Sequence, residues 1–155
     1  MNDWNAPCDG CITCALRCTA GIKISEFEYT RIVEELRSQE ASAVRKVLAQ
    51  EKHLIWFEEI RYEACLFLNT ETRLCLIYPA RPLICRLFGR VKHLPCPAGW
   101  VPADFDARDI LQAYAAQPLK TFQEWMGITG VFNFDDLLGG KDVLPCYDIS
   151  EEMAP

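Results

Sequence analysis

Cysteine spacing constrains this chain more than any other feature of its sequence. Nine cysteines occur in 155 residues, and eight of them form two groups of four. The first group lies within one short window, whereas the members of the second are widely and almost evenly separated. Thiols gathered in this way are typical of a disulfide framework or of a metal site. The two groups are Cys8, Cys11, Cys14 and Cys18, and then Cys65, Cys75, Cys85 and Cys96.

Composition and charge favour the metal site over disulfides. Half of the residues are hydrophobic, which suits a single globular domain over residues 1–155. The formal charge of −6 repels a phosphate backbone, so nucleic acid is not an expected partner. No apolar run approaches the roughly 20 residues of a transmembrane helix, and the first residues lack the pattern of a signal peptide. We therefore expect a cytoplasmic protein with no transmembrane segment and with reduced thiols.

The first cysteine group has the spacing of an iron–sulfur ligand run. Cys8-x2-Cys11-x2-Cys14-x3-Cys18 matches the bacterial ferredoxin pattern, in which closely spaced thiolates hold a 4Fe–4S cluster. Thr19 stands where ferredoxins have proline. Paired cysteines two residues apart also bind tetrahedral zinc. The spacing therefore indicates a metal and leaves iron and zinc open.

The second group is less specific, because nine or ten residues separate its members. Each of its cysteines could be an ordinary buried thiol, but in company with the first group we predict that they are metal ligands. Arg81 and Arg86 flank Cys85, where cations would offset the negative charge of a thiolate site. His93 could replace a thiolate on zinc. Cys146 has no spaced partner and is predicted to be a buried thiol outside the site.

Hydrophobic periodicity predicts an α+β fold, a mostly helical small domain with one short β-hairpin and cysteine-rich metal-binding loops. The first helix should begin at Ser25, because Ser25 and Glu28 form a capping-box pattern. Asp104 or Asp106 should cap a later helix that runs to about Ala116. The remaining helices are expected at about 39–51, at 82–88, from Pro118 to about Met126, and as a short turn at 135–138.

The hairpin carries a geometric prediction about two of the thiols. Apolar runs at 62–68 and 74–78 flank a polar turn at 69–72, which is typical of two paired strands. A loop with an odd number of residues would place Cys65 directly opposite Cys75, with Cβ atoms about 4.5–5.5 Å apart. A loop with an even number would put the two side chains on opposite faces. We predict the odd loop and a shared metal.

The downstream motif resembles a known family. Cys65-Leu-Phe-Leu, Arg73-Leu-Cys75-Leu-Ile-Tyr and Arg81-Pro-Leu-Ile-Cys85-Arg-Leu-Phe are similar to the YkgJ-type cysteine-cluster family. That family is described as zinc- or iron-chelating, and its signature begins with CxxCxxCC. Ala15 stands where the signature has its fourth cysteine, and Cys18 follows about one helical turn later. Flagellin lysine methylases resemble the same family and are associated with an iron–sulfur cluster, so the resemblance favours iron.

Three functions follow from these motifs. The first is a protein with one or two iron–sulfur clusters of the 4Fe–4S type, acting in electron transfer or as a redox accessory subunit with a protein partner. The second is a zinc-binding structural or interaction module. The third is an iron–sulfur enzyme of the methylase kind, although the sequence has no CxxxCxxC triad and no glycine-rich nucleotide loop. The residues alone do not decide whether the chain is an enzyme, and no catalytic residue is predicted.

Overall fold

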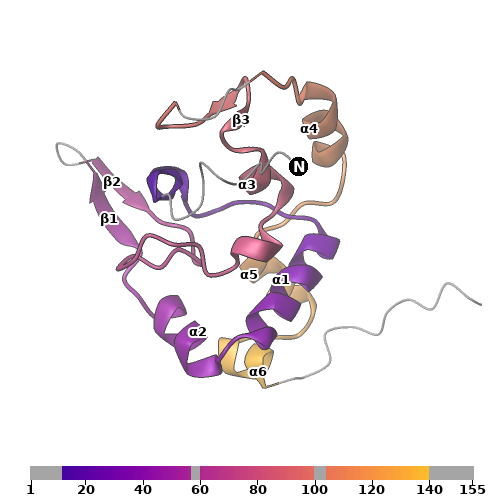
Figure 1. Cartoon of the computed structure of the whole chain (residues 1–155). Helices are drawn as coiled ribbons and strands as arrows, with labels where there is room; N and C mark the ends of the chain where they lie inside the picture. The colour runs from indigo at the N-terminus through magenta and orange to yellow at the C-terminus, as the bar shows by residue number, and fades with distance from the viewer. Residues whose placement is uncertain (1–11, 57–59, 100–103, 140–155) are drawn as a thin grey trace, which may run out of the picture.

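The computed structural model describes residues 12–56, 60–99 and 104–139. It has an α+β architecture in which helices predominate, with the short antiparallel β1–β2 pair at the left and β3 at the top near α4 (Figure 1). None of the described helices has the length and apolar character needed to cross a bilayer. The elements in chain order are η2 (Thr13–Arg17), α1 (Glu26–Ser38), α2 (Ala41–Leu48), β1 (His53–Trp56), β2 (Ile60–Glu63), η3 (Tyr78–Ala80), α3 (Leu83–Leu87), β3 (Arg90–Val91), β4 (Leu94–Pro95), α4 (Arg108–Ala115), α5 (Phe122–Ile128) and α6 (Phe134–Leu138).

Helix α1 organises the helical part of the molecule. The predicted capping box is present: the Ser25 hydroxyl accepts from the Glu28 N–H, and the Glu28 carboxylate accepts from the Ser25 N–H at 2.9 Å. The face that carries Tyr29, Ile32 and Leu36 is fully buried. Burying such side chains stabilises a fold by about 1.5–3 kcal/mol each, so this face provides much of the core's stability.

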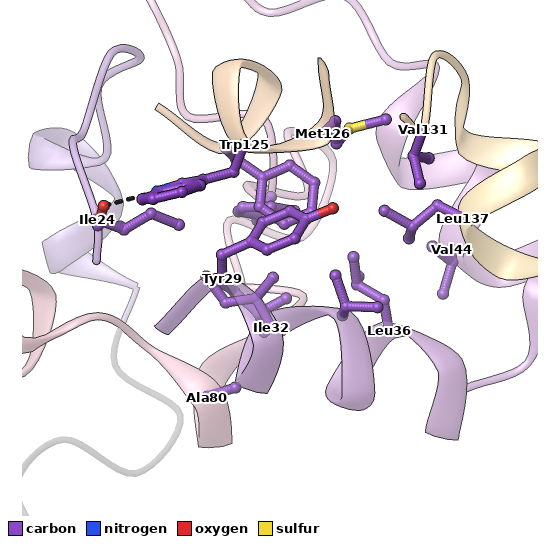
Figure 2. Packing of buried hydrophobic residues seen from close by; sticks show 14 residues of the cluster. Ile24, Tyr29, Ile32, Leu36, Val44, Ala80, Trp125, Met126, Val131 and Leu137 are labelled. Carbon is purple, nitrogen blue, oxygen red and sulfur yellow. Dashed lines mark hydrogen bonds between the residues drawn. The ribbon is translucent and has the colours of Figure 1, made fainter. Parts of the chain in front are cut away.

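Helices α5 and α6 cover the buried face of α1. Figure 2 shows Trp125 and Met126 of α5 above Tyr29, with Leu137 of α6 beside Leu36. The Tyr29 ring lies 5.0 Å from the Phe122 ring, and the Trp125 indole N–H donates to the Ile24 carbonyl at 2.9 Å (Figure 2). The aromatic core therefore joins α1 to a helix nearly one hundred residues later.

Two predicted helix starts are displaced. Helix α4 has Ala107 as its N-cap residue, so neither predicted aspartate occupies that position. Asp106 still accepts from the N–H of Arg108, the first residue of the helix. Helix α5 begins after Thr121, three residues beyond Pro118, since Thr121 and Glu124 form a second capping box. A complete capping box satisfies two orphan N–H donors, which makes it a stronger start signal than the proline.

The predicted hairpin at 62–68 and 74–78 is wrong. The strands pair one segment earlier, where β1 and β2 are antiparallel and His53 lies opposite Glu63. A second short pair joins β3 to β4. One isolated bridge in the predicted hairpin pairs Leu68 with Cys75, so Cys65 does not face Cys75 across a ladder. The Asn69 side chain accepts from the N–H groups of Glu71 and Thr72, which folds this stretch into turns.

Candidate metal centre

The two cysteine groups meet through backbone pairing. The segment after η2 runs alongside the end of β2, and Figure 1 shows this indigo turn between the β1–β2 hairpin and α3. The Cys65 N–H donates to the Cys18 carbonyl at 2.7 Å, and the Ala20 N–H donates to the Glu63 carbonyl at 2.9 Å. These bonds extend the sheet by a third segment. They fix Cys18 next to Cys65 although 46 residues separate them in the chain.

Cys65 and Cys75 each begin a tight turn. The Leu68 N–H donates to the Cys65 carbonyl at 3.0 Å, and the Tyr78 N–H donates to the Cys75 carbonyl at 3.3 Å. Within these turns, the backbone N–H groups of Phe67 and Leu68 partly offset the rise in the pKa of Cys65, and that of Ile77 does the same for Cys75. Donors held in this way stabilise a thiolate, which is the form that binds metal.

Cys85 enters from the other side on helix α3. Pro82 is the N-cap residue with extended backbone, one position before the first turn in which the sequence predicts it. The helix ends at Leu87, and Gly89 follows with φ of +80°, a conformation that favours glycine. The short helix thus presents Cys85 toward the turns that begin at Cys65 and Cys75.

These thiols surround one cavity of about 390 Å³. Its apolar floor is the edge of the helical core, where Ile32, Ile77 and Phe122 line both the cavity and the core cluster. Cations also line it, in contrast to the net negative charge of the chain. The five lining thiols are Cys14, Cys18, Cys65, Cys75 and Cys85, and the lining cations are Arg17, Lys52, Arg73 and Arg81.

Burial sets the electrostatics of the thiols. Burial, with a smaller contribution from repulsion by neighbouring thiols, raises the pKa of Cys18 and Cys85 to about 12 and that of Cys75 to about 11. Burial also raises the pKa of Cys65. Mutual repulsion among the groups means that they interact as one cluster. A metal ion binds here only if these thiols release their protons. The positive charge of the metal would then offset the repulsion among the thiolates.

Arg81 is the cation that faces these thiols. Its guanidinium offsets a small part of the rise in the pKa of Cys18, Cys75 and Cys85. It also stacks on the Tyr78 ring, with 3.7 Å between the guanidinium carbon and the ring centroid. Its buried Nε–H has no hydrogen-bond partner among the described residues. A buried donor of this kind is costly unless something accepts from it. The donor set, buried thiols with one unpaired N–H, fits zinc or iron.

The structure does not bring every predicted residue to the cavity. Cys96 lies beside Gly89 after β4 and does not line it. Arg86 is exposed on α3 and is also absent from the lining, as is His93. Cys8, Cys11 and Cys146 lie outside the described residues. Within the described part of the chain, no three His, Cys, Asp or Glu side chains form a group that could hold a metal ion as they stand.

The described cysteines are thiols rather than disulfides, in accord with a metal-binding role.

Sequence reasoning missed the contributions of Lys52 and Tyr78 to the site. Lys52 Nζ donates to the Leu68 carbonyl at 2.6 Å and so braces the turn that begins at Cys65. The signal for these turns was present, because the units Cys65-Leu-Phe-Leu and Cys75-Leu-Ile-Tyr repeat the same pattern.

The site therefore defines a cysteine-rich metal-chelating protein. A family model for CxxCxxCC domains matches residues 7–116, and its description is "Putative zinc- or iron-chelating domain". The match covers well over half of the chain, and the chain belongs to this family. Neither a search of curated proteins nor a search of solved structures gave a match. The cysteine cluster and its metal chelation are thus shared with the family, and the family leaves the metal undecided.

Proposed function

We propose that this chain holds an iron–sulfur cluster of the 4Fe–4S type and acts in electron transfer or as a redox accessory subunit of a protein partner. The observation that carries the proposal is the convergence of five thiols from both cysteine groups on a single cavity of about 390 Å³. One zinc ion needs four ligands in direct contact, with Zn–S distances of about 2.3 Å. A cavity bounded by thiols suits a group of several atoms.

The ligands would come from the five cavity thiols, together with Cys8 and Cys11 of the same run. Bound there, the cluster would supply one-electron redox chemistry. The chain's own part is to bury the thiols, to exclude water with the apolar floor, and to offer N–H donors toward sulfur. Arg81 would offset the negative charge of the centre. Arg86, exposed on α3, would do so from further away or would face a partner protein.

Anaerobic purification followed by metal and sulfide analysis tests the proposal. We expect iron and acid-labile sulfide in equal amounts, with visible charge-transfer absorption that bleaches on reduction by dithionite. A colourless protein with stoichiometric zinc and no labile sulfide would overturn the cluster and favour the zinc module.

Matched cysteine variants then test which thiols are ligands. Cys85→Ser removes a thiol that lines the cavity, and we expect it to lose most of the bound metal. Cys96→Ser changes a thiol outside the lining, so its loss should be smaller. Equal losses would show that the metal centre extends beyond the cavity described above.

A further inference from the structure

A buried carboxylate lies where α1, α3 and α4 meet. Glu28 is only 7% exposed and is the one buried charged side chain among the described residues. Ionised side chains are rarely buried unless hydrogen bonds replace the lost water. The capping box accounts for one hydrogen bond to Glu28 Oε2, from the Ser25 N–H, and for none to Oε1.

Both oxygens of Glu28 accept hydrogen bonds from distant segments. Oε1 accepts from the Leu83 N–H at 2.6 Å, 55 residues away in sequence. Oε2 accepts from the Tyr114 hydroxyl at 2.5 Å in addition to the Ser25 N–H. The Tyr114 hydroxyl also lies 3.2 Å from the Lys23 carbonyl, which fixes α4 against the start of α1. One carboxylate thus connects three segments of the chain.

The bond to Leu83 matters because α3 cannot cap itself. The helix has five residues, and its N-cap residue, Pro82, provides no side-chain hydrogen bond. The first N–H groups of any helix lack partners within the helix, and so short a helix is not stable alone. A carboxylate at its N-terminus both accepts from one of these N–H groups and complements the helix dipole. Leu83 is two residues before Cys85.

We infer that Glu28 is a positioning residue of the metal centre. By capping α3 from outside, it holds the helix in the orientation that turns Cys85 toward the other cavity thiols. Tyr114 supports Glu28 from α4. The inference rests on the proposed function to the extent that Cys85 is a metal ligand, and it holds equally for iron and for zinc.

A pair of variants separates positioning from general stability. Glu28→Ala removes the acceptor for Leu83, whereas Ser25→Ala weakens the same capping box and leaves the Glu28–Leu83 bond in place. Metal release to a chelator should be roughly tenfold faster in Glu28→Ala than in Ser25→Ala, which corresponds to one buried hydrogen bond to a charged group. In metal-free protein, Cys85 alkylation, followed by peptide mass spectrometry, should accelerate by a similar factor.

The outcomes distinguish this inference from the proposed function. Equal release and equal Cys85 alkylation in the two variants would overturn the positioning role, whatever metal is bound. If the wild-type protein binds no metal but Cys85 alkylation still accelerates in Glu28→Ala alone, the proposed function fails and the positioning role stands.

A measurement on the wild-type protein keeps the test open if Glu28→Ala does not fold. The Leu83 N–H should be protected from hydrogen exchange to about the degree of the core amides of α1, despite its place in the first turn of α3. Exchange at the rate of an open amide would overturn the inference.

Discussion

The helical half of the molecule and its cysteine-bearing half are held together by different means. Around α1, the fold rests on a continuous apolar core closed by aromatic rings and by two capping boxes. Around the cavity, residues 12–20 and 65–89 form turns, isolated bridges and a five-residue helix. The thiols there sit in buried positions that raise their pKa, at a cavity that lacks packed side chains. Burial of apolar side chains stabilises the helical half, whereas the cysteine-bearing half surrounds a cavity for a ligand.

Metal removal should produce the largest difference in behaviour between the two halves. On chelation we expect the amides of the turns that begin at Cys65 and Cys75, at Leu68 and Tyr78, to lose protection from hydrogen exchange, because metal ligation and folding are coupled. The amides of α1 should keep their protection, since its buried face contacts α5 and α6. Equal loss in both halves would mean that the metal holds the whole fold.

A cavity in the helical core should give the opposite pattern. Leu36 is fully buried and does not line the thiol cavity. Leu36→Ala should lower the free energy of unfolding by about 2–5 kcal/mol through lost burial and the void left behind. Metal content per folded molecule should not change. Urea denaturation and metal analysis of the folded fraction measure both, and metal loss in folded protein would contradict the separation of the two halves.

Alkaline pH should weaken the metal-free thiol half. Unfolded thiols have a pKa near 9.0, whereas burial raises the pKa of Cys75 to about 11 and that of Cys85 to about 12. The folded state then holds protons that the unfolded state has lost, so this stabilising contribution is present below pH 9.0 and declines above it. Urea unfolding of metal-free protein at about pH 8 and about pH 10 measures the loss.

The control for that experiment is Cys85→Ser, which removes one of the buried thiols. Its stability should fall less steeply between the two pH values than that of the wild-type protein. Identical slopes would indicate that other groups, and not the cavity thiols, cause the decline.

The smallest expected effect concerns a cap far from the thiols. The Asn133 side chain accepts from the Asp136 N–H at 2.8 Å and starts α6. Asn133→Ala should cost about 1 kcal/mol of unfolding free energy and leave metal content unchanged. The urea midpoint reports the first and metal analysis the second; a change in metal content would link α6 to the site.

Local signals predicted several helix starts and stops in both halves. The Ser25 capping box, the stop of α3 before Gly89 and the short α6 depend on residues within a few positions of one another. The α+β class with predominant helix followed from the same patterns. The cysteine motifs resembled a metal-chelating family, and the family match confirms that resemblance. Helix propensity and capping depend on residues within one or two helical turns, so they can be recognised in a single sequence.

Tertiary structure alone decided which thiols meet. The apolar runs around Cys65 and Cys75 suggested strands, but the Asn69 turn and the Leu68–Cys75 bridge replaced the expected register. Cys18 joins Cys65 through a backbone bond across 46 intervening residues. The Glu28–Leu83 bond is equally remote. Such contacts form only when segments far apart in the sequence come together in space. No local sequence pattern specifies which distant segments will meet, because loop closure depends on the whole fold.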